Sequence, residues 1–239
     1  MKKIEAKIVA DSISPQGHRI TSMLLTYPRF IHGEIMTHRI FSRNSASSRA
    51  IPFKKMVRMV KEDPFIPIAW QKDHRGMQGT EYLSEDEIVR ANNAWIWNLK
   101  QVIDNAEFLS KSNVTKQLCN RLLEPFMWHT TLITATEFEN FFNLRCPQYE
   151  YYDMLTGSQR FFKSKKDWLN YYNNKPLPKA KHISKIPETD LEWLQVNKSQ
   201  AEIHIQALAE AMWDQQQDSI PKKLLPGEYH VPFFEIEED

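Results

Sequence analysis

Polar and apolar residues alternate at the start of the chain in a way that is typical of β-strands. Ile4, Ala6 and Ile8 are separated by single charged residues, and residues 20–27 form a second, largely apolar segment. Pro15 and Gly17 mark a turn between the two segments. The pattern predicts a β-hairpin over residues 4–27.

Helical spacing of apolar residues predicts most of the other elements. The clearest case is a helix over residues 85–109, which follows a capping box formed by Ser84 and Glu87. Further helices are predicted over residues 28–41, 54–61, 114–123, 131–144 and 199–213. Polar or loop-like segments are predicted at 42–49 and 64–79, and an extended tail at 221–234 leads into acidic residues 235–239.

These elements predict an α+β fold: a helix-rich single domain with a small mixed or antiparallel sheet. The chain has 239 residues, of which 41% are hydrophobic, and this is ample for one sizeable core. Residues 148–198 are richer in Lys, Asn, Tyr and Pro than their surroundings. We interpret them as an inserted segment within one domain that covers residues 1–239.

Composition narrows the range of functions. The formal net charge is +1, so no bulk field would attract nucleic acid, and no nucleic-acid partner is expected. No segment approaches the roughly 20 apolar residues of a membrane span, so no membrane partner is expected. The two cysteines do not make a disulfide scaffold, so the expected location is the cytoplasm, or the host cytoplasm for a viral chain.

The densest polar segment is residues 37–49, which contain three arginines, a histidine, four serines and an asparagine. The rigid fork of donors on Arg matches phosphate or carboxylate oxygens. Serine hydroxyls and backbone N–H groups complete such an anion site. No Gly-rich phosphate loop is present in the sequence. A phosphate-binding loop and a solvated basic loop with surface ion pairs are about equally compatible with these residues.

The same segment resembles the signature of the flavin-dependent thymidylate synthase (ThyX) family, R-H-R-x-x-S-x-N-x-x-S-x-R. The matching positions are held by His38, Arg39, Ser42, Asn44, Ser47 and Arg49. Thr37 stands where the family has its first arginine, and Ser45 replaces a usual acidic residue. The chain is therefore similar to a divergent, viral-type member of the family.

Other segments resemble the family in the same order along the chain. Residues 65–79 are similar to its F-Y-x-P…W…K-Q-G segment, and residues 121–125 to its R-x-x-L-P turn. Residues 140–145 are similar to its N-F-x-x-L-R helix end, and residues 201–209 to its A-Q-x-E-I-x-x-L-A helix. Together with the signature, these segments cover most of the chain outside residues 148–198.

The resemblance implies a role for each matched residue. The nucleotide phosphate would be held by Ser47, Ser48 and Arg49. The pyrimidine or sugar would be reached by Arg121 and by Arg145, which is also the candidate catalytic residue. The FAD contacts would come from Thr37, His38, Arg39, Ile40, Asn44 and Asn140. No metal ligand is expected, because the histidines lack the spacing of a metal site.

Glu34 lies one helical turn before His38, where the family usually has a glutamine close to the base. A glutamine offers a donor and an acceptor, whereas a carboxylate only accepts unless it is protonated. We therefore treat Glu34 as nucleotide-binding and hypothesise a shift toward a cytosine-like edge, whose exocyclic amine donates. Both dUMP and dCMP stay open as substrates.

The implied reaction is the reductive C5-methylation of dUMP to dTMP, with FAD as cofactor and methylenetetrahydrofolate and NADPH as co-substrates. The family is homotetrameric with sites between subunits, so a homo-oligomer is expected. The reaction needs no cysteine nucleophile, and Cys119 is expected to be buried.

The departures from the family cluster where the flavin would bind. The family segment H-x-T-P-F-E-H is only faintly matched by residues 14–18, and Thr37 removes an arginine. Two alternatives to a complete enzyme follow: a second chain completes the flavin site, or the chain is a degenerate nucleotide-binding subunit.

Overall fold

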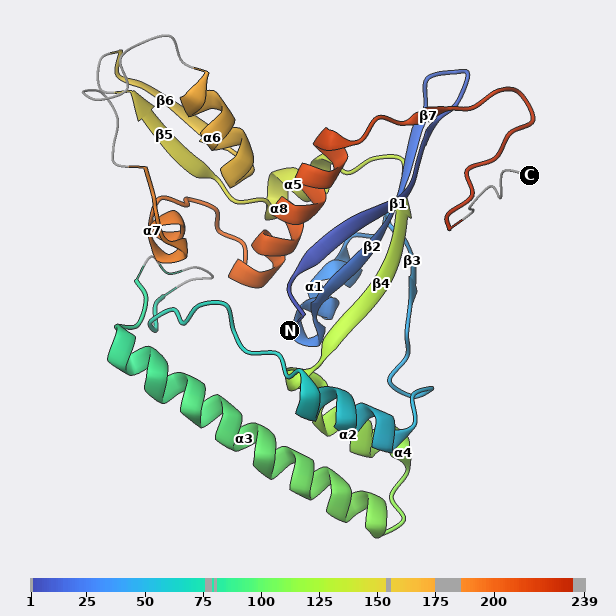
Figure 1. Ribbon diagram of the computed structural model, residues 1–239, viewed down its shortest axis with the longest axis vertical. Coiled ribbons are helices and arrows are strands. Elements are labelled where there is room, and N and C mark those ends of the chain that lie inside the picture. Colours follow the sequence, from blue (N-terminus) through green and yellow to red (C-terminus); the bar gives the residue numbers. More distant parts are fainter. Residues whose placement is uncertain (1, 76–78, 80, 154–155, 175–185, 234–239) are drawn as a thin grey trace.

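The computed structural model describes residues 2–75, 79, 81–153, 156–174 and 186–233. A five-stranded mixed sheet, with strand order β3-β4-β2-β1-β7, lies at its centre (Figure 1). The pairs are antiparallel except for β1 with β7, which is parallel. The predicted α+β class with a small mixed sheet is therefore confirmed. The strands of this sheet are β1 (Glu5–Ile13), β2 (Arg19–Pro28), β3 (Ser42–Ser45), β4 (Trp128–Ala135) and β7 (Lys222–Lys223).

The predicted N-terminal hairpin is confirmed, because β1 and β2 pair as antiparallel neighbours. Gly17 adopts a φ of +88° in the turn between them, a conformation that favours glycine over residues with a Cβ. Met23, Leu25 and Tyr27 are fully buried on one face of β2, as the period-2 pattern of a half-buried strand requires.

The helix predicted over residues 131–144 is wrong. Residues 128–135 form β4 in the middle of the sheet, and only Glu139–Arg145 is helical, as α5. The sequence Thr130-Thr131-Leu132-Ile133-Thr134 is rich in β-branched residues, which fit a pleated sheet better than a helix. Pairing with β2 on one side and β3 on the other satisfies its backbone.

The predicted helix at residues 28–41 is shorter than expected. It consists of a 3-10 turn, Arg29–Ile31, and the six-residue helix α1, His32–Thr37. The next residues were expected to form a loop, but the first of them make the edge strand β3. Residues 42–45 take their hydrogen-bond partners from β4, a distant part of the sequence, so local pattern did not reveal this strand.

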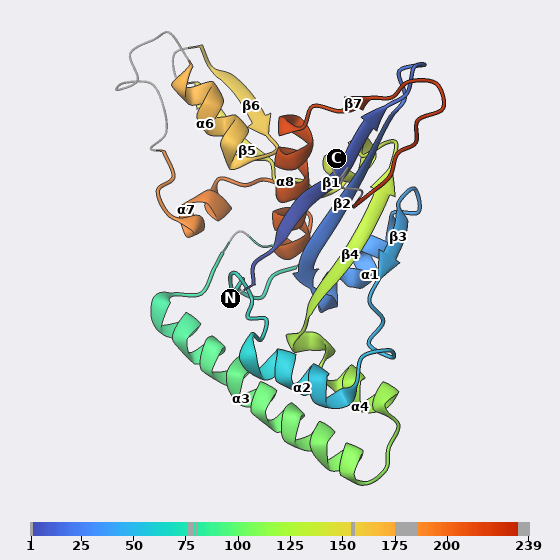
Figure 2. The ribbon, with the colours of Figure 1, turned by 45° about the vertical axis from the view of Figure 1, so that its right-hand side comes forward.

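Helices α1, α5 and α8 (Ile203–Asp218) cover one face of the sheet. The main core lies between these helices and the sheet. It includes Ile31 of the 3-10 turn, Ile35 of α1, Phe141 and Phe142 of α5, and residues of α8. The structure places α8 a few residues later than the predicted helix at 199–213. Figure 2 shows α8 beside β1, with which it packs directly.

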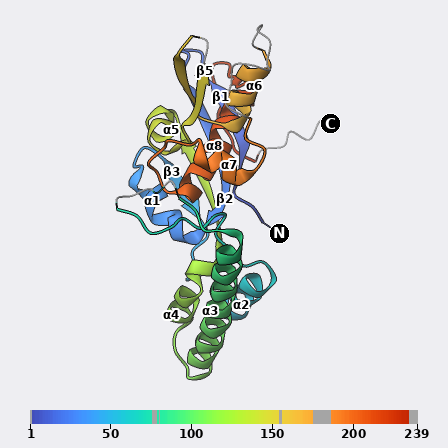
Figure 3. The same cartoon turned by 90° about the vertical axis from the view of Figure 1, so that its left-hand side faces the viewer.

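Three helices form a bundle that projects beyond one end of the sheet (Figure 3). They are α2 (Phe53–Glu62), α3 (Glu85–Lys111) and α4 (Lys116–Leu122). The predicted capping box is present at the start of α3, where Ser84 and Glu87 satisfy each other's backbone groups. A second apolar cluster, with Met56, Leu99 and Ile103 among its members, holds the bundle together.

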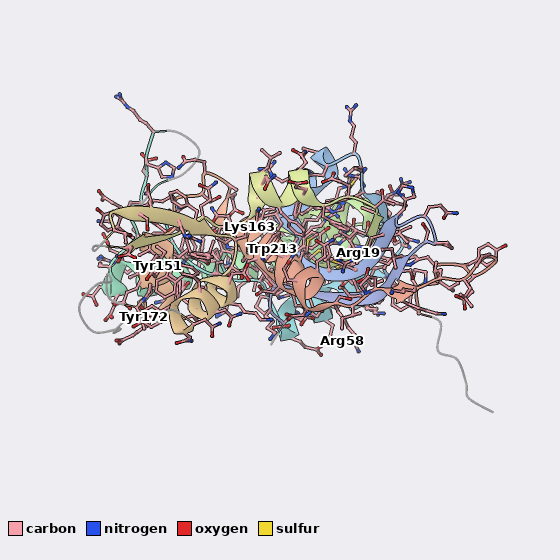
Figure 4. The ribbon with its side chains drawn as sticks, turned by 90° about the horizontal axis from the view of Figure 1, so that it is seen from above. Arg19, Arg58, Tyr151, Lys163, Tyr172 and Trp213 are labelled. Carbon is pink, nitrogen blue, oxygen red and sulfur yellow. The ribbon has the colours of Figure 1, made fainter. Side chains whose placement is uncertain are left out.

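Residues 149–195 contain a small unit with its own apolar cluster. Its elements are β5 (Tyr149–Asp153), β6 (Ser158–Phe162), α6 (Lys165–Asn173) and α7 (Asp190–Gln195). Tyr151, Trp168 and Trp193 are buried within it. Lys163 lies 4.8 Å from the ring centroid of Trp213 in α8, which links this unit to the main core (Figure 4). That residues 148–198 are an insertion stays a prediction.

After α8 the chain is extended, as predicted, through β7 to residue 233. His230 anchors it to the sheet, with ring nitrogens 3.0 Å from Ser12 Oγ and 2.9 Å from Ser22 Oγ. The acidic segment 235–239 and the motif residues Met77 and Gln78 lie outside the described residues. None of the described helices combines the length and apolar character of a membrane span.

Candidate functional site

The end of α1 brings the polar segment to its position. The Thr37 hydroxyl donates to the carbonyl of Glu34 at 2.7 Å, and Arg43 Nη1 donates to the carbonyl of Met36 at 2.9 Å. These bonds satisfy carbonyls that the last turn of a helix leaves without partners. Thr37, which was expected to contact the flavin, therefore engages its hydroxyl within its own helix.

His38 and Arg145 meet at the centre of the site. Arg145 Nε donates to His38 Nε2 at 3.2 Å, although 107 positions separate the two residues. Because Arg only donates, His38 Nε2 is the acceptor and its ring is neutral, with its proton on Nδ1. Burial lowers the pKa of His38, and the charges of Arg145 and Arg43 lower it further.

The aromatic residues around His38 fix the plane of its ring. The ring packs edge-on against Phe141 of α5, with centroids 4.8 Å apart, and also contacts Phe41. His38 is only 8% exposed. The imidazole is therefore a rigid support for the guanidinium of Arg145, the last residue of α5.

Arg145 keeps part of its guanidinium open. Its Nε is engaged by His38, while its two Nη groups have no protein partner among the described residues. The side chain lies at the C-terminal end of α5 and is half-buried. A half-buried guanidinium with two open nitrogens is suited to bind an anion or a carbonyl oxygen.

Glu34 lies in α1 near this guanidinium. Burial raises the pKa of the Glu34 carboxyl, and the charge of Glu202 raises it further, against the opposing charges of Arg145 and His204. The carboxyl therefore stays protonated to a higher pH than an ordinary glutamic acid. A protonated carboxyl can donate as well as accept.

Glu202 and His204, which sequence reasoning did not select, complete this side of the site. Glu202 caps α8 by accepting from the backbone N–H groups of His204 at 2.8 Å and Ile205 at 3.1 Å. His204 Nε2 accepts from the N–H of Ile68 at 3.1 Å, so its Nδ1 carries the proton and donates to Glu202. The only signal in the sequence was that the family's Gln and Glu are altered at these positions.

The loop expected to hold phosphate is a tight turn in which Ser47 and Arg49 face outward and Ser48 faces inward. Ser47 and Arg49 are exposed, and Ser47 Oγ accepts from the N–H of Arg49 at 3.2 Å. Ser48 is buried and donates its hydroxyl hydrogen to Glu124 Oε1 at 3.1 Å. Ser47 and Arg49 are thus free to meet a phosphate, whereas Ser48 is engaged behind the loop.

Glu124 connects this loop to the sheet. Its second oxygen lies 3.8 Å from Arg29 Nε, and Arg29 Nη1 donates to His129 Nε2 at 3.2 Å. Burial lowers the pKa of His129 to about 3, with smaller effects from Arg29 and His32. Burial also lowers the pKa of His32 to about 4. Both histidines are therefore neutral near pH 7, and the carboxylate is compensated by Arg29.

The remaining predicted residues are exposed at the surface of the molecule. Their side chains make no polar bond within the part of the chain that the structure describes, and this leaves them accessible to a bound molecule. They are Arg39 and Ile40 in the turn after α1, Asn44 in β3, Arg121 in α4 and Asn140 in α5.

Both cysteines are buried, and the described residues offer no metal site. Cys119 is fully buried, as predicted, and Cys146 is 2% exposed. Burial raises the pKa of Cys146 well above its usual range, so it is no ready nucleophile. Among the described residues, no three His, Cys, Asp or Glu side chains are grouped so that they could hold a metal ion.

No protein-family model matches the sequence, and no curated protein sequence matches it. Among solved structures, the chain is similar to the UMP/dUMP methylase PolB from Streptomyces cacaoi bound with 5-Br UMP, at 16% identity and a TM-score of 0.48 over 61% of this chain and 78% of PolB. The same enzyme bound with 5-Br dUMP is 14% identical, with a TM-score of 0.49. This alignment covers 61% of this chain and 79% of PolB. At TM-scores below 0.5, this similarity supports no conclusion about substrate, cofactor or reaction.

Proposed function

We propose that the chain is a pyrimidine-nucleotide enzyme that reductively methylates C5 of dUMP, with FAD as its cofactor. One observation carries the proposal. His38 and Arg145 belong to two motifs that resemble the thymidylate synthase family independently, and the fold brings them within 3.2 Å. A chance sequence match at either motif would not require the two side chains to meet.

The open side of Arg145 would hold the nucleotide through its two Nη groups. Ser47 and Arg49 would bind the phosphate, and the exposed Arg121 would add a further positive charge. The overall reaction converts dUMP, methylenetetrahydrofolate, NADPH and a proton into dTMP, tetrahydrofolate and NADP⁺. The family assembles as a homotetramer, and we expect a homo-oligomer here, which light scattering would test.

The flavin would be held by the surface residues beside His38. Arg39, Asn44 and Asn140 have polar side-chain groups without protein partners among the described residues, and Ile40 is 52% exposed. These residues fit a large, partly apolar and anionic cofactor. When bound, FAD supplies the hydride that the transferred one-carbon group needs to become a methyl group. The protein's part is to orient the nucleotide and the cofactor.

A related enzyme that acts on dCMP is a second candidate, and Glu34 favours it. An ionised Glu34 would accept from the exocyclic amine of cytosine, whereas a protonated Glu34 would offer a donor and an acceptor to uracil. Because the pKa of Glu34 is raised, its protonated form, which would recognise uracil, is favoured at lower pH. We therefore propose dUMP as the substrate and keep dCMP as the alternative.

A nucleotide-binding subunit that needs another chain, or has lost catalysis, is the third candidate. Thr37 favours it, because this position offers no positive charge to a flavin and its hydroxyl is engaged with Glu34. Such a subunit would still bind the nucleotide through Arg145 and the Ser47–Arg49 turn.

Tritium release from dUMP labelled at C5 tests the proposal, because methylation must displace the hydrogen at that carbon. With FAD, NADPH and methylenetetrahydrofolate present, the wild-type chain is expected to release tritium, and Arg145→Ala is not. Binding of dUMP without release would favour the incomplete subunit. Release from labelled dCMP alone would favour the cytosine nucleotide.

A further inference from the structure

The Ser47–Arg49 turn is held from behind by a buried asparagine in α4. Asn120 is 0% exposed, and its Nδ2 donates to the carbonyl of Ser48 at 2.7 Å and to the carbonyl of Ile51 at 3.0 Å. Both hydrogens of the amide are therefore used on the same loop. The two carbonyls flank Arg49, so one side chain fixes the backbone on both sides of it.

The position of Asn120 is costly for the fold. Its Oδ1 is buried with no hydrogen-bond partner among the described residues. An unsatisfied buried acceptor loses its hydrogen bonds to water and destabilises the folded state, and an apolar residue would avoid that loss. The two donors of Asn120 to the loop are thus the interactions that make an amide favourable at this position.

The two hydrogen bonds from Asn120 to the loop backbone determine which side chains of the turn face outward. With the Ser48 carbonyl turned toward Asn120 and the Ser48 hydroxyl toward Glu124, Ser48 faces the interior. The N–H of Ala50 bonds to the carbonyl of Ser47 at 3.0 Å and closes the turn. Ser47 and Arg49 are then presented to solvent on a backbone that is already ordered. An ordered loop loses less conformational entropy when it binds a ligand.

We propose that Asn120 is a positioning residue for the phosphate of the nucleotide: it holds the Ser47–Arg49 turn in the conformation that binds the phosphate. This inference rests on the proposed function, in which that turn is the phosphate site. Asn120 does not itself touch the phosphate. Because Asn120 acts only through the Ser47–Arg49 turn, replacing it should affect only ligands that carry a phosphate.

Asn120→Asp tests the inference with minimal change in shape. The variant replaces the amide donors with carboxylate oxygens, which repel the carbonyls of Ser48 and Ile51. The affinity for dUMP is measured by calorimetry, and the affinity for deoxyuridine, which lacks the phosphate, by ligand-observed NMR. Asn98→Asp, on the exposed side of α3, makes the same chemical change away from the loop and is the matched control.

We expect Asn120→Asp to bind dUMP at least about 10-fold more weakly, as for the loss of one or two hydrogen bonds to a charged group. Its affinity for deoxyuridine and both affinities of Asn98→Asp should be unchanged. If circular dichroism shows that Asn120→Asp does not fold, Asn120→Ser removes the same two contacts without adding a charge. The same difference between dUMP and deoxyuridine is then expected.

Two results would overturn the inference. A folded variant that binds dUMP as tightly as the wild type would exclude a role in positioning. A folded variant that loses dUMP and deoxyuridine equally would indicate general structural damage. Failure of the wild-type chain to bind dUMP at all would instead refute the proposed function on which the inference rests.

Discussion

Arg145 Nε donates to His38 Nε2 at 3.2 Å, and this contact joins the end of α5 to the turn that follows α1. It holds the histidine as the neutral tautomer and leaves the two Nη groups of the arginine open. The resemblance to thymidylate synthases assigned a role to each residue separately. The structure adds that one is the support of the other.

Arg145→Lys is expected to weaken dUMP binding by about 10–100-fold, which corresponds to the roughly 1.5–3 kcal/mol of a charge-assisted hydrogen bond. Lysine keeps the charge but lacks a planar group that can bond His38 and a ligand at the same time. Calorimetry measures the affinity. Arg58→Lys, at a side chain that is 67% exposed on α2, should have no effect. Unchanged affinity in Arg145→Lys would exclude the arginine from the site.

Ser47→Ala and Ser48→Ala are expected to differ. Ser47 is exposed and keeps its hydroxyl hydrogen free for a phosphate oxygen, whereas Ser48 donates its hydrogen to Glu124. Ser47→Ala should weaken dUMP binding by about 10-fold, the effect of one hydrogen bond to a charged group. Ser48→Ala should have a clearly smaller effect in the same titration. The reverse order would mean that Ser48 turns outward to meet the phosphate.

The preference for dUMP over dCMP is expected to rise as the pH falls through the raised pKa of Glu34. Protonation gives Glu34 the donor that uracil recognition requires. The ratio of the two dissociation constants, measured over a pH series that starts near the ordinary glutamate pKa of about 4.3 and extends to neutral pH, removes the titration of the phosphate that both nucleotides share. Glu34→Gln should favour dUMP at every pH, with a flat ratio. A flat ratio in the wild type would show that Glu34 does not read the base.

Stability is expected to fall with pH below about 6.5 because of His129. Its pKa is near 6.5 when unfolded and about 3 when folded, so between these values only the unfolded chain binds the proton. The free energy of unfolding should therefore decrease by about 1.4 kcal/mol per pH unit from this group. Urea midpoints at pH 7.5, 6.5 and 5.5 measure it.

His129→Gln is the comparison for this experiment. It should be less stable than the wild type at pH 7.5, because the ring packs against Tyr27 and His32, yet it should lose less stability on acidification. Parallel curves for the two proteins would contradict a buried neutral histidine.

Trp168→Ala is expected to open the unit at residues 149–195 and leave the main sheet folded. Trp168 is 1% exposed and central to that unit's cluster, so its loss should cost about 3–5 kcal/mol locally. Hydrogen exchange should become fast in β5 and α6 and stay slow in β2 and β4. Trp97→Ala, at a side chain that is 61% exposed, is the control. Loss of protection in β2 and β4 as well would mean that the unit and the sheet unfold together.

The parts of the fold that could be predicted are those fixed by local pattern. The hairpin and α3 carry a clear period and clear end signals. The strand β4 was missed because residues 131–144 contain a strand and then a helix, with no glycine or proline to separate them. The edge strand β3 is polar, and only its pairing with β4 makes it a strand.

The candidate site was predicted as a set of separate residues, and their relationships came from the fold. Ser48 was assigned to the phosphate, but it faces Glu124. Glu202 and His204 were passed over because their pairing depends on the N-terminus of α8 and on the backbone of Ile68. Asn120 gave no signal, since a lone asparagine in a short helix is ordinary until its partners are known.

The visible absorption spectrum of the chain with added FAD, recorded during a dUMP titration, is the decisive measurement of a flavin-dependent nucleotide site. We expect flavin bands that shift saturably with dUMP in the wild type and do not shift in Arg145→Ala. A nucleotide site at Arg145 and His38 would be contradicted if dUMP left the flavin bands of the wild type unshifted and calorimetry gave no heat of dUMP binding.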